Sequence, residues 1–426
     1  MTSDGILKRS SKAHLYRPIF MDQQVLNSIK VGLDQAWPID RPPVGFKSLP
    51  RVAAGRYTDP DFLALEKKHL WECSWLYVCH SDQLPAAGSF VSFENTGSPI
   101  VVVRGKDEII RAFYNTCQHR GGPLVKSASG TLEGGFVCAF HGWKYDLNGS
   151  LVGVRDRSDF GDLDFDCHGL KEIRCESFGN WVFINEDPQA ESLLSYLTPV
   201  ADHWQQVEPH TTRHVASSSY VVECNCKMLL EAFLEVYHLG NVHAATVDRF
   251  LDYRSSRHVL WPRGHSLMVT PNRDPEWVDP GTKGMPEFPG VSDLPGKLNV
   301  SYNIFPNLIT PIAPTGIPFL LFWPQDDATT KIDCHWFSPD WGEGEKHALW
   351  ETRMRNFERI LEEDLELAPH LQKSLESKGF SGGQLSFQER RIYHWHEELD
   401  RRIGPDRVRE QLRVEPRLQN LTELSV

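Results

Sequence analysis

The sequence predicts an α+β protein in which an all-β domain precedes a domain of mixed helices and strands. Short β-rich segments separated by turn residues fill residues 46–186. Longer strand segments follow between residues 217 and 338, joined by loops that contain Pro and Gly. A long helix is predicted from roughly Glu345 to Ser377, with an apolar stripe along one face. At 426 residues, the chain has room for two or three domains.

Composition excludes several classes of function. The net charge is −12 and basic residues form no long runs, so neither nucleic acid nor an anionic membrane surface is an expected partner. No run of 18 apolar residues predicts a transmembrane helix, and the N-terminal residues lack the apolar core of a secretory signal. Nine cysteines without regular spacing favour a reducing compartment. We therefore expect a cytoplasmic protein.

The first elements follow from turn and cap signals. Val25 to Trp37 has the spacing of a short amphipathic helix, and a second helix is predicted after the cap at Asp59. Turn signals at residues 97–99 and 105–107 separate the first strands, and Asn148-Gly149 indicates a hairpin. The predicted strands of the β domain include 90–93, 100–103, 109–113 and 181–184. Those of the second domain lie near 217–226, 258–269, 300–312, 318–324 and 332–338.

Two Cys-His pairs lie close together in the β domain. One residue separates Cys117 from His119, and two separate Cys138 from His141. Two thiolates and two imidazoles form the ligand set of a Rieske [2Fe–2S] centre, and they also form a possible tetrahedral zinc site. We expect the four side chains on two adjacent loops at one end of the β domain.

A second group of candidate ligands follows a hundred residues later. Glu235 and His238 are three residues apart, so they share a face of a predicted helix. His238 and His243 are five apart, and an ideal helix would leave their rings roughly 140° apart. Both can bind one metal only if the helix is interrupted, and we predict the break at Gly240-Asn241. Alternatively, the histidines are ordinary core or cap residues.

Asp364 is the candidate third ligand. It points to the centre of the apolar stripe of the long predicted helix, whereas Glu362 and Glu363 point away from it. A carboxylate on an apolar face needs a metal or a cationic partner such as Arg390 or Arg391. Two His and one carboxylate form the facial triad of oxygen-activating Fe(II) sites. The stripe consists of Phe357, Ile360, Leu361, Leu367, Ala368 and Leu371.

These motifs together resemble the large (alpha) subunit of Rieske non-haem iron ring-hydroxylating oxygenases. The resemblance extends from about Arg56 to Gly404 and rests on both Cys-His pairs, on Glu231 to His243, and on Glu363-Asp364. It implies a Rieske domain at 46–186 inserted in a helix-grip catalytic domain with an antiparallel sheet, formed by residues 1–45 and 187–426. It also implies a mononuclear Fe(II) and a head-to-tail homotrimer, with a β subunit possible. Glu235 would bridge the iron site to the cluster of a neighbouring subunit.

The resemblance implies a terminal oxygenase that receives electrons from a separate reductase or ferredoxin. The expected reaction is O2-dependent hydroxylation of a small organic, aromatic substrate, as in aromatic hydrocarbon catabolism. Many ring dioxygenases have Asp where this chain has Glu235. In this respect the chain resembles the branch of mono-oxygenases, demethylases and quaternary-ammonium oxygenases. Oxidative N- or O-demethylation, or mono-oxygenation of a quaternary-ammonium compound, is therefore the alternative reaction. A Rieske electron carrier without oxygenase activity, and a zinc-stabilised binding protein, are the alternatives of other classes.

The substrate pocket is expected to be apolar. Its predicted lining consists of Phe233, Leu234, Tyr302, Ile304, Phe305, Leu308, Phe319 and Leu321. An aromatic cage for a cationic substrate is a further possibility, although the same side chains are also typical of a buried core. The candidate cage residues are Trp261, Tyr302, Phe305, Phe322 and Trp323.

Overall fold

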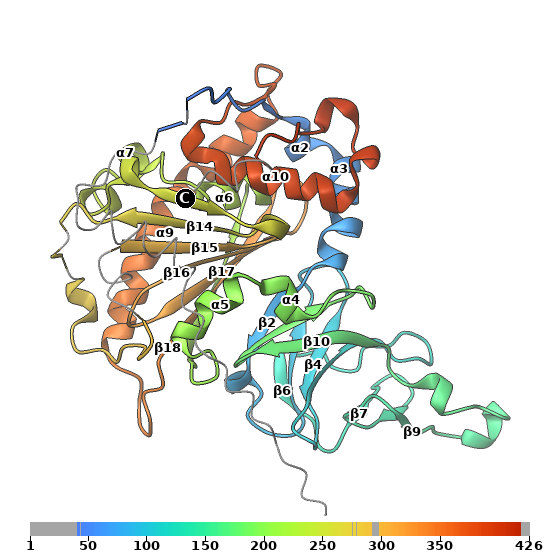
Figure 1. Cartoon of the computed structure of the whole chain (residues 1–426). Helices are drawn as coiled ribbons and strands as arrows, with labels where there is room; N and C mark the ends of the chain where they lie inside the picture. The colour runs from blue at the N-terminus through green and yellow to red at the C-terminus, as the bar shows by residue number, and fades with distance from the viewer. Residues whose placement is uncertain (1–40, 43, 275, 278, 292–297, 419–426) are drawn as a thin grey trace, which may run out of the picture.

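Two seven-stranded antiparallel sheets organise the chain and lie beside one another (Figure 1). The computed structural model describes residues 41, 42, 44–274, 276, 277, 279–291 and 298–418. The helix expected at Val25 to Trp37 lies outside these residues. Helices α4 (Leu193–Leu197) and α5 (Val200–Trp204) lie between the two sheets.

The first sheet has the strand order β2-β11-β10-β5-β4-β3-β6. Its strands are short, and turns with Gly at positive φ, such as Gly97 at 88°, join them. A separate three-stranded sheet, β7-β8-β9, extends from its far end (Figure 1). The strands are β2 (Leu76–His80), β3 (Ser89–Phe93), β4 (Ile100–Arg104), β5 (Ile110–Tyr114), β6 (Ser129–Thr131), β7 (Phe136–Val137), β8 (Lys144–Tyr145), β9 (Leu151–Gly153), β10 (Glu172–Phe178) and β11 (Trp181–Asn185).

The segment before the first sheet contacts C-terminal elements. β1 (Val52–Ala53) pairs with β19 (Gly382–Gly383), and Arg56 of α2 (Gly55–Thr58) forms a buried ion pair of 2.6 Å with Asp400. The Asp59 carboxylate accepts hydrogen bonds from two backbone N–H groups and caps α3 (Pro60–His69), as its sequence predicts. Residues 52–69, which the sequence groups with the β domain, therefore pack beside the C-terminal helix α10 (Arg390–Ile403).

The second sheet has the strand order β12-β18-β17-β16-β15-β14-β13. Helices α6 (Cys226–Ala232), α7 (Leu239–Val242) and the long α9 (Leu349–Leu375) pack against it. The strands are β12 (Arg213–Val222), β13 (Arg257–Leu260), β14 (Ser266–Pro271), β15 (Leu298–Ile304), β16 (Leu308–Ile312), β17 (Ile317–Pro324) and β18 (Thr330–Ser338).

Two segments predicted as single strands are hairpins. The prediction at 258–269 splits into β13 and β14, because Pro262 supplies no backbone N–H and Gly264 has a φ of 74°. The prediction at 300–312 splits into β15 and β16 around the turn that begins at Phe305. The long helix was predicted correctly and extends from Leu349 to Leu375.

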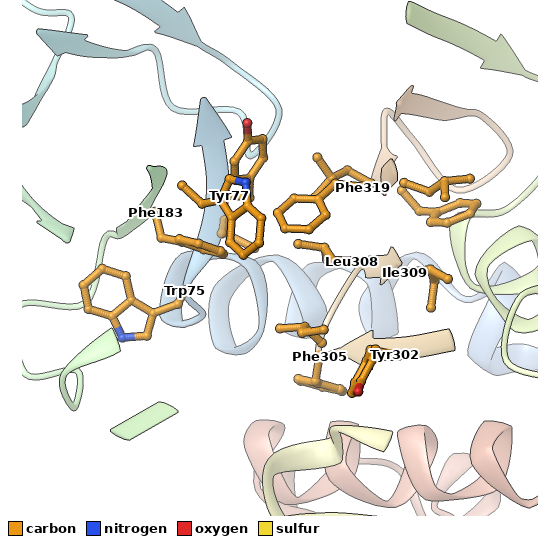
Figure 2. Packing of buried hydrophobic residues seen from close by; sticks show 14 of the residues in the cluster. Trp75, Tyr77, Phe183, Tyr302, Phe305, Leu308, Ile309 and Phe319 are labelled. Atoms are coloured by element: carbon orange, nitrogen blue, oxygen red, sulfur yellow. The ribbon is translucent and has the colours of Figure 1, made fainter. Parts of the chain in front are cut away.

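Alternate residues of the second sheet face two different partners. On the first-sheet side, Phe319 packs against Tyr77 and Trp181, with ring centroids 5.2 and 4.8 Å away (Figure 2). On the opposite side, which we call the α9 side, Trp336 packs against Phe357 of α9 at 5.1 Å. Both faces are buried, so the strands are apolar on both sides.

The predicted lining of the substrate pocket is wrong for its strand residues. The register places Tyr302, Ile304, Leu308, Phe319 and Leu321 on the first-sheet side, facing away from α6 and α9. Residues directly opposite one another on paired strands share a face. The α9 side instead carries His258, Met268, Ser301, Asn303, Ile309, Leu320 and Phe322.

The aromatic-cage residues also do not share one surface. Trp323 packs on Phe93 of the first sheet at 5.4 Å, and Tyr302 stacks on Trp261. Phe305 packs on Trp395 of α10, so Phe322 is the cage residue on the α9 side. These rings form a buried core.

Packing between the two sheets should dominate the stability of this fold. Leu321→Ala removes a buried side chain from that interface and is expected to cost about 2–5 kcal/mol of unfolding free energy. Leu194→Ala is the matched control, because Leu194 is 48% exposed, and it should change stability by less than about 0.5 kcal/mol. Chemical denaturation of the purified variants measures both values. Equal effects would show that this interface contributes little.

Candidate metal centres

His238, His243 and Asp364 meet beside α9, although Asp364 is 121 positions after His243 in the sequence. One possible ligand atom from each side chain lies within 4.8 Å of the others. Asp364 Oδ1 is 2.9 Å from His243 Nε2 and 3.5 Å from His238 Nε2. Two imidazoles and one carboxylate in this arrangement leave coordination positions open, as oxygen-activating iron requires.

A one-turn helix joins the two histidines. Helix α6 ends at Ala232, and the one-turn helix α7 begins after His238 and ends before His243. The predicted interruption exists, but its position was wrong: Gly240 and Asn241 lie inside α7, and the break lies before His238. The histidines stand at the two ends of this turn, and their ring centroids are 5.2 Å apart.

Each of these histidines is oriented by a second carboxylate. Glu235 Oε1 accepts a hydrogen bond from His238 Nδ1, and Glu235 Oε2 accepts one from the backbone N–H of His238 at 3.2 Å. Glu363 Oε2 lies 2.6 Å from His243 Nδ1 and accepts a 2.7 Å hydrogen bond from the Thr246 hydroxyl. These contacts fix both rings with Nε2 directed towards Asp364.

The role of Glu363 was not predicted. The helical projection correctly separates it from Asp364, but it does not show that the His243 ring lies beside that flank of α9. The local signal was the pair of adjacent acidic residues Glu363 and Asp364, which can contact two different atoms of one partner. Asp364 does not pair with Arg391, whose hydrogen-bond partners among the described residues are neutral oxygens.

The carboxylates make this site electronegative. Burial lowers the pKa of both histidines, but the hydrogen bonds and charges of Glu235, Glu363 and Asp364 more than offset it and raise the pKa of each. Burial also acts on Glu363, yet its contacts with His243 and Thr246 lower the pKa of its carboxyl. Such an environment favours a bound cation over an empty site.

The two Cys-His loops have the same local fold. The Cys117 N–H donates to the Gly122 carbonyl at 2.8 Å, and the Cys138 N–H donates to the Trp143 carbonyl at 2.9 Å. In each loop the residue four positions after the cysteine is a glycine with positive φ, 72° at Gly121 and 75° at Gly142. The two loops therefore share one backbone turn, although the histidine is two positions after the cysteine in the first loop and three positions after it in the second.

The enclosed donor atoms fit a [2Fe–2S] cluster. His119 Nδ1 is buried and has no hydrogen-bond partner among the described residues, although buried polar atoms normally have one. The His119 and His141 rings are 4.5 Å apart, and the Tyr145 hydroxyl lies 3.3 Å from Cys117 Sγ. A Cβ on Gly122 would lie 3.1 Å from Cys138 Sγ, so a side chain there would crowd the site.

The Cys-His loops and the histidine-carboxylate site lie at opposite ends of the molecule. The loops flank β7 and β8 beyond the first sheet, whereas α7 lies at the far end of the second sheet (Figure 1). Around the loops Phe140 is 59% exposed, and beside Glu235 the Tyr237 side chain is 57% exposed. Each site thus lies beside an exposed aromatic side chain.

Comparison with known proteins identifies the family. The sequence profile of the Rieske [2Fe-2S] domain matches residues 74–167, and that of the "Ring hydroxylating alpha subunit (catalytic domain)" matches residues 209–405. The chain belongs to the Rieske non-haem iron oxygenases. Its cofactors are a Rieske [2Fe–2S] cluster and a mononuclear iron, so a zinc-stabilised binding protein is excluded.

Relatives of this Rieske oxygenase include enzymes of two kinds. It is 28% identical to the carnitine monooxygenase oxygenase subunit of Escherichia coli (strain K12), over 78% of this chain and 86% of the relative. It is also 28% identical to the toluate 1,2-dioxygenase subunit alpha of Pseudomonas putida, over 86% of this chain and 85% of the relative.

A solved structure has the same fold. It is the structure of a quaternary ammonium Rieske monooxygenase linked to carnitine oxidation by gut microbiota. The superposition covers 86% of this chain and 100% of the solved chain, with a TM-score of 0.73 and 21% sequence identity. This chain is an oxidoreductase, and it is the terminal oxygenase component of its enzyme system. No helix among its described residues is long and apolar enough to span a membrane.

Removal of the Asp364 carboxylate should empty one centre and leave the other intact. In Asp364→Ala, iron per chain should fall from about three atoms to about two, while the absorption and EPR signal of the cluster persist. Glu362→Ala is the control, because Glu362 is exposed on the same helix. Iron analysis of both proteins tests this, and three iron atoms in Asp364→Ala would place the ligand elsewhere.

Loss of the Glu363 carboxylate should weaken iron binding without abolishing it. Glu363→Ala removes the hydrogen bond to His243 Nδ1, and we expect about 10- to 100-fold weaker iron affinity in a chelator competition. Glu366→Ala, at an exposed position one turn away, should bind iron like the parent protein. Identical affinity in both variants would show that Glu363 does not orient the ligand.

Proposed function

We propose that Cys117, His119, Cys138 and His141 hold the cluster, and that His238, His243 and Asp364 hold the iron. The single observation behind the iron site is the convergence of three ligand atoms from α7 and α9, each histidine being held by a further carboxylate. The first assignment is supported by the unpartnered His119 Nδ1 and the paired loops. We place the Rieske domain between about residues 74 and 186, inserted in a catalytic domain to which residues 52–69 belong.

The protein residues contribute orientation and charge. When bound, the iron supplies O2 activation at coordination sites left open by the three ligands. Glu235 and Glu363 hold the two imidazoles with Nε2 towards Asp364, so the ligands need not reorganise. Residues 41–418, which carry the two centres, contain no dinucleotide-binding motif. Electrons are therefore supplied by a separate reductase or ferredoxin. Both proteins work in the cytoplasm.

We infer that the working unit is a head-to-tail homotrimer. The two centres lie at opposite ends of one chain, so the cluster of one subunit is better placed to serve the iron of another (Figure 1). The apolar surface with Phe140 at the cluster, and the one with Tyr237 beside Glu235, are candidates for this contact. Leu367 and Leu371 add exposed apolar area on α9. A β subunit would bind elsewhere on the trimer.

The proposed reaction is oxygenation of a small organic substrate on the α9 side of the second sheet, with aromatic hydroxylation as the first candidate. Mono-oxygenation of a quaternary-ammonium compound is the second, since Glu occupies position 235 and carnitine monooxygenases are among the relatives. Reductase-coupled O2 uptake with aromatic acids, aryl ethers and quaternary amines, combined with product analysis, distinguishes the two. Substrate-independent electron transfer alone would support the carrier alternative.

Glu235 is proposed to connect the iron site to a cluster histidine of the neighbouring subunit. Glu235→Ala should retain both metal centres but slow single-turnover oxidation of the reduced cluster by at least about 100-fold, because the hydrogen-bonded link is lost. Rapid-mixing spectroscopy at the cluster absorption measures this rate. The exposed Glu366→Ala is the control, and a parental rate in Glu235→Ala would refute the bridge.

Mixing two inactive variants tests the shared active site. His119→Ala should lack a working cluster, and Asp364→Ala should lack the iron. Unfolded and refolded together, or co-expressed, they should form mixed trimers with partial activity, because some contacts pair an intact cluster with an intact iron. Each variant alone should be inactive. Absence of activity in mixed trimers of confirmed composition would mean that each chain uses its own two centres.

A further inference from the structure

We propose that Arg391 and His258 form a subsite that binds a carboxylate of the substrate. This inference rests on the proposed oxygenase function and specifies its substrate class. Both residues lie on the α9 side of the second sheet, at the end covered by α10. Neither belongs to the metal centres, and two separate observations point to an anion-binding site.

The first observation is a buried cation without a counter-ion. Arg391 is fully buried, and its guanidinium donates to the Ser266 hydroxyl at 2.9 Å, the Leu234 carbonyl at 3.3 Å and the Ser301 carbonyl at 3.5 Å. Among the described residues no carboxylate pairs with it. Burial first, and then the neighbouring charge of Arg390, lower its pKa to about 9. A buried charge is costly unless an opposite charge compensates it.

The second observation is a buried histidine without hydrogen bonds. His258 lies on β13 directly opposite Met268 of β14, and neither ring nitrogen has a partner in the part of the chain that the structure describes. Burial, with Arg390 and Arg391 nearby, holds its pKa well below the usual range, so the imidazole is neutral and one nitrogen carries a hydrogen. That N–H can donate to an anion beside Arg391.

The subsite adjoins the segment that carries the iron ligands. The Leu234 carbonyl that binds Arg391 belongs to the residue just before Glu235. Met268, opposite His258, packs with Val236 and Leu239, which flank His238. A substrate anchored by its carboxylate at Arg391 would therefore extend along the α9 side towards His238.

The same geometry disfavours a cation at this end. An added positive charge would meet Arg391 and Arg390 in a buried environment, where repulsion is weakly screened. The His258 nitrogens are enclosed by the protein, so an anion can reach them only after a neighbour moves. Met268 is the neighbour best able to do so, because its unbranched side chain changes rotamer readily.

Paired acid and amide probes test the subsite directly. The protein, loaded with cluster and iron, is titrated calorimetrically with benzoate, phenylacetate, octanoate and γ-butyrobetaine, and with the primary amide of each. At least one acid should bind about 10- to 100-fold more tightly than its amide, because only the acid supplies the counter-charge. Arg391→Met should reduce that preference to about threefold or less, and His258→Leu should reduce it in part.

Two further variants keep the test decisive. Arg402→Met is the matched control on the same helix: Arg402 pairs with Glu398, and its loss should leave the acid preference unchanged. If Arg391→Met does not fold, Arg391→Lys keeps the charge but loses the fork of donors, and it should retain only part of the preference. Melting temperature and metal content establish that each variant is folded.

Several outcomes would overturn the subsite. These are equal binding of acids and amides, no binding of any acid, or an undiminished acid preference in Arg391→Lys and His258→Leu. O2 uptake separates this failure from failure of the proposed function: reductase-coupled oxygenation of a neutral amide without acid preference refutes the subsite and leaves the oxygenase intact. Acid preference that depends on Arg391, without oxygenation of any probe, supports the subsite and contradicts the oxygenase proposal.

Discussion

The contact between Asp364 and the two histidines of α7 is the interaction on which the catalytic end of the chain depends. It joins α9 to a one-turn helix that follows an interrupted segment. Such a short helix has little stability of its own. Its position is therefore fixed by side chains, with Glu235 and Glu363 on the Nδ1 atoms and Asp364 facing the Nε2 atoms. Three carboxylates around two imidazoles also explain why this end of the protein attracts a metal cation.

Candidate ligands could be selected from sequence spacing, because a metal centre needs particular side chains within a short range. The Cys-His pairs, the two histidines five residues apart, and a carboxylate on the apolar stripe of α9 carried the resemblance to the family, and the structure brings His238, His243 and Asp364 together. The position of the helix break was not predictable from Gly240 and Asn241, because glycine tolerates a helical conformation when tertiary contacts hold it. Glu363 was missed because its partner is remote in sequence.

The pocket was mispredicted for a different physical reason. In a strand that is buried on both faces, apolar residues occupy alternate positions on both sides, so hydrophobicity does not indicate which side faces the helices. Tyr302 and Phe319 were as plausible from the sequence as Met268 and Phe322. The correct side became evident only from the register and from the rings that contact Trp181 and Phe233. For the same reason, His258 was not singled out.

The separation of the two centres within one chain is the basis for the proposed pairing of centres between subunits. The first sheet supports the cluster loops at one end, and the packing of both sheets against each other holds them away from α7 (Figures 1 and 2). In the proposed trimer, electrons would reach the iron site from the cluster of a second copy of the chain. The exposed aromatic side chains Phe140 and Tyr237 are consistent with such a contact.

Pulsed EPR tests this central claim most directly. Chains with a reduced cluster and Mn(II) substituted at the mononuclear site are assembled alone, or diluted with an excess of chains that carry neither metal centre. The proposed trimer predicts strong short-range dipolar coupling in the undiluted assembly and its loss on dilution, because the coupled centres belong to different chains. Coupling of the same strength in both samples would contradict the account, since the two centres would then lie close together within one chain.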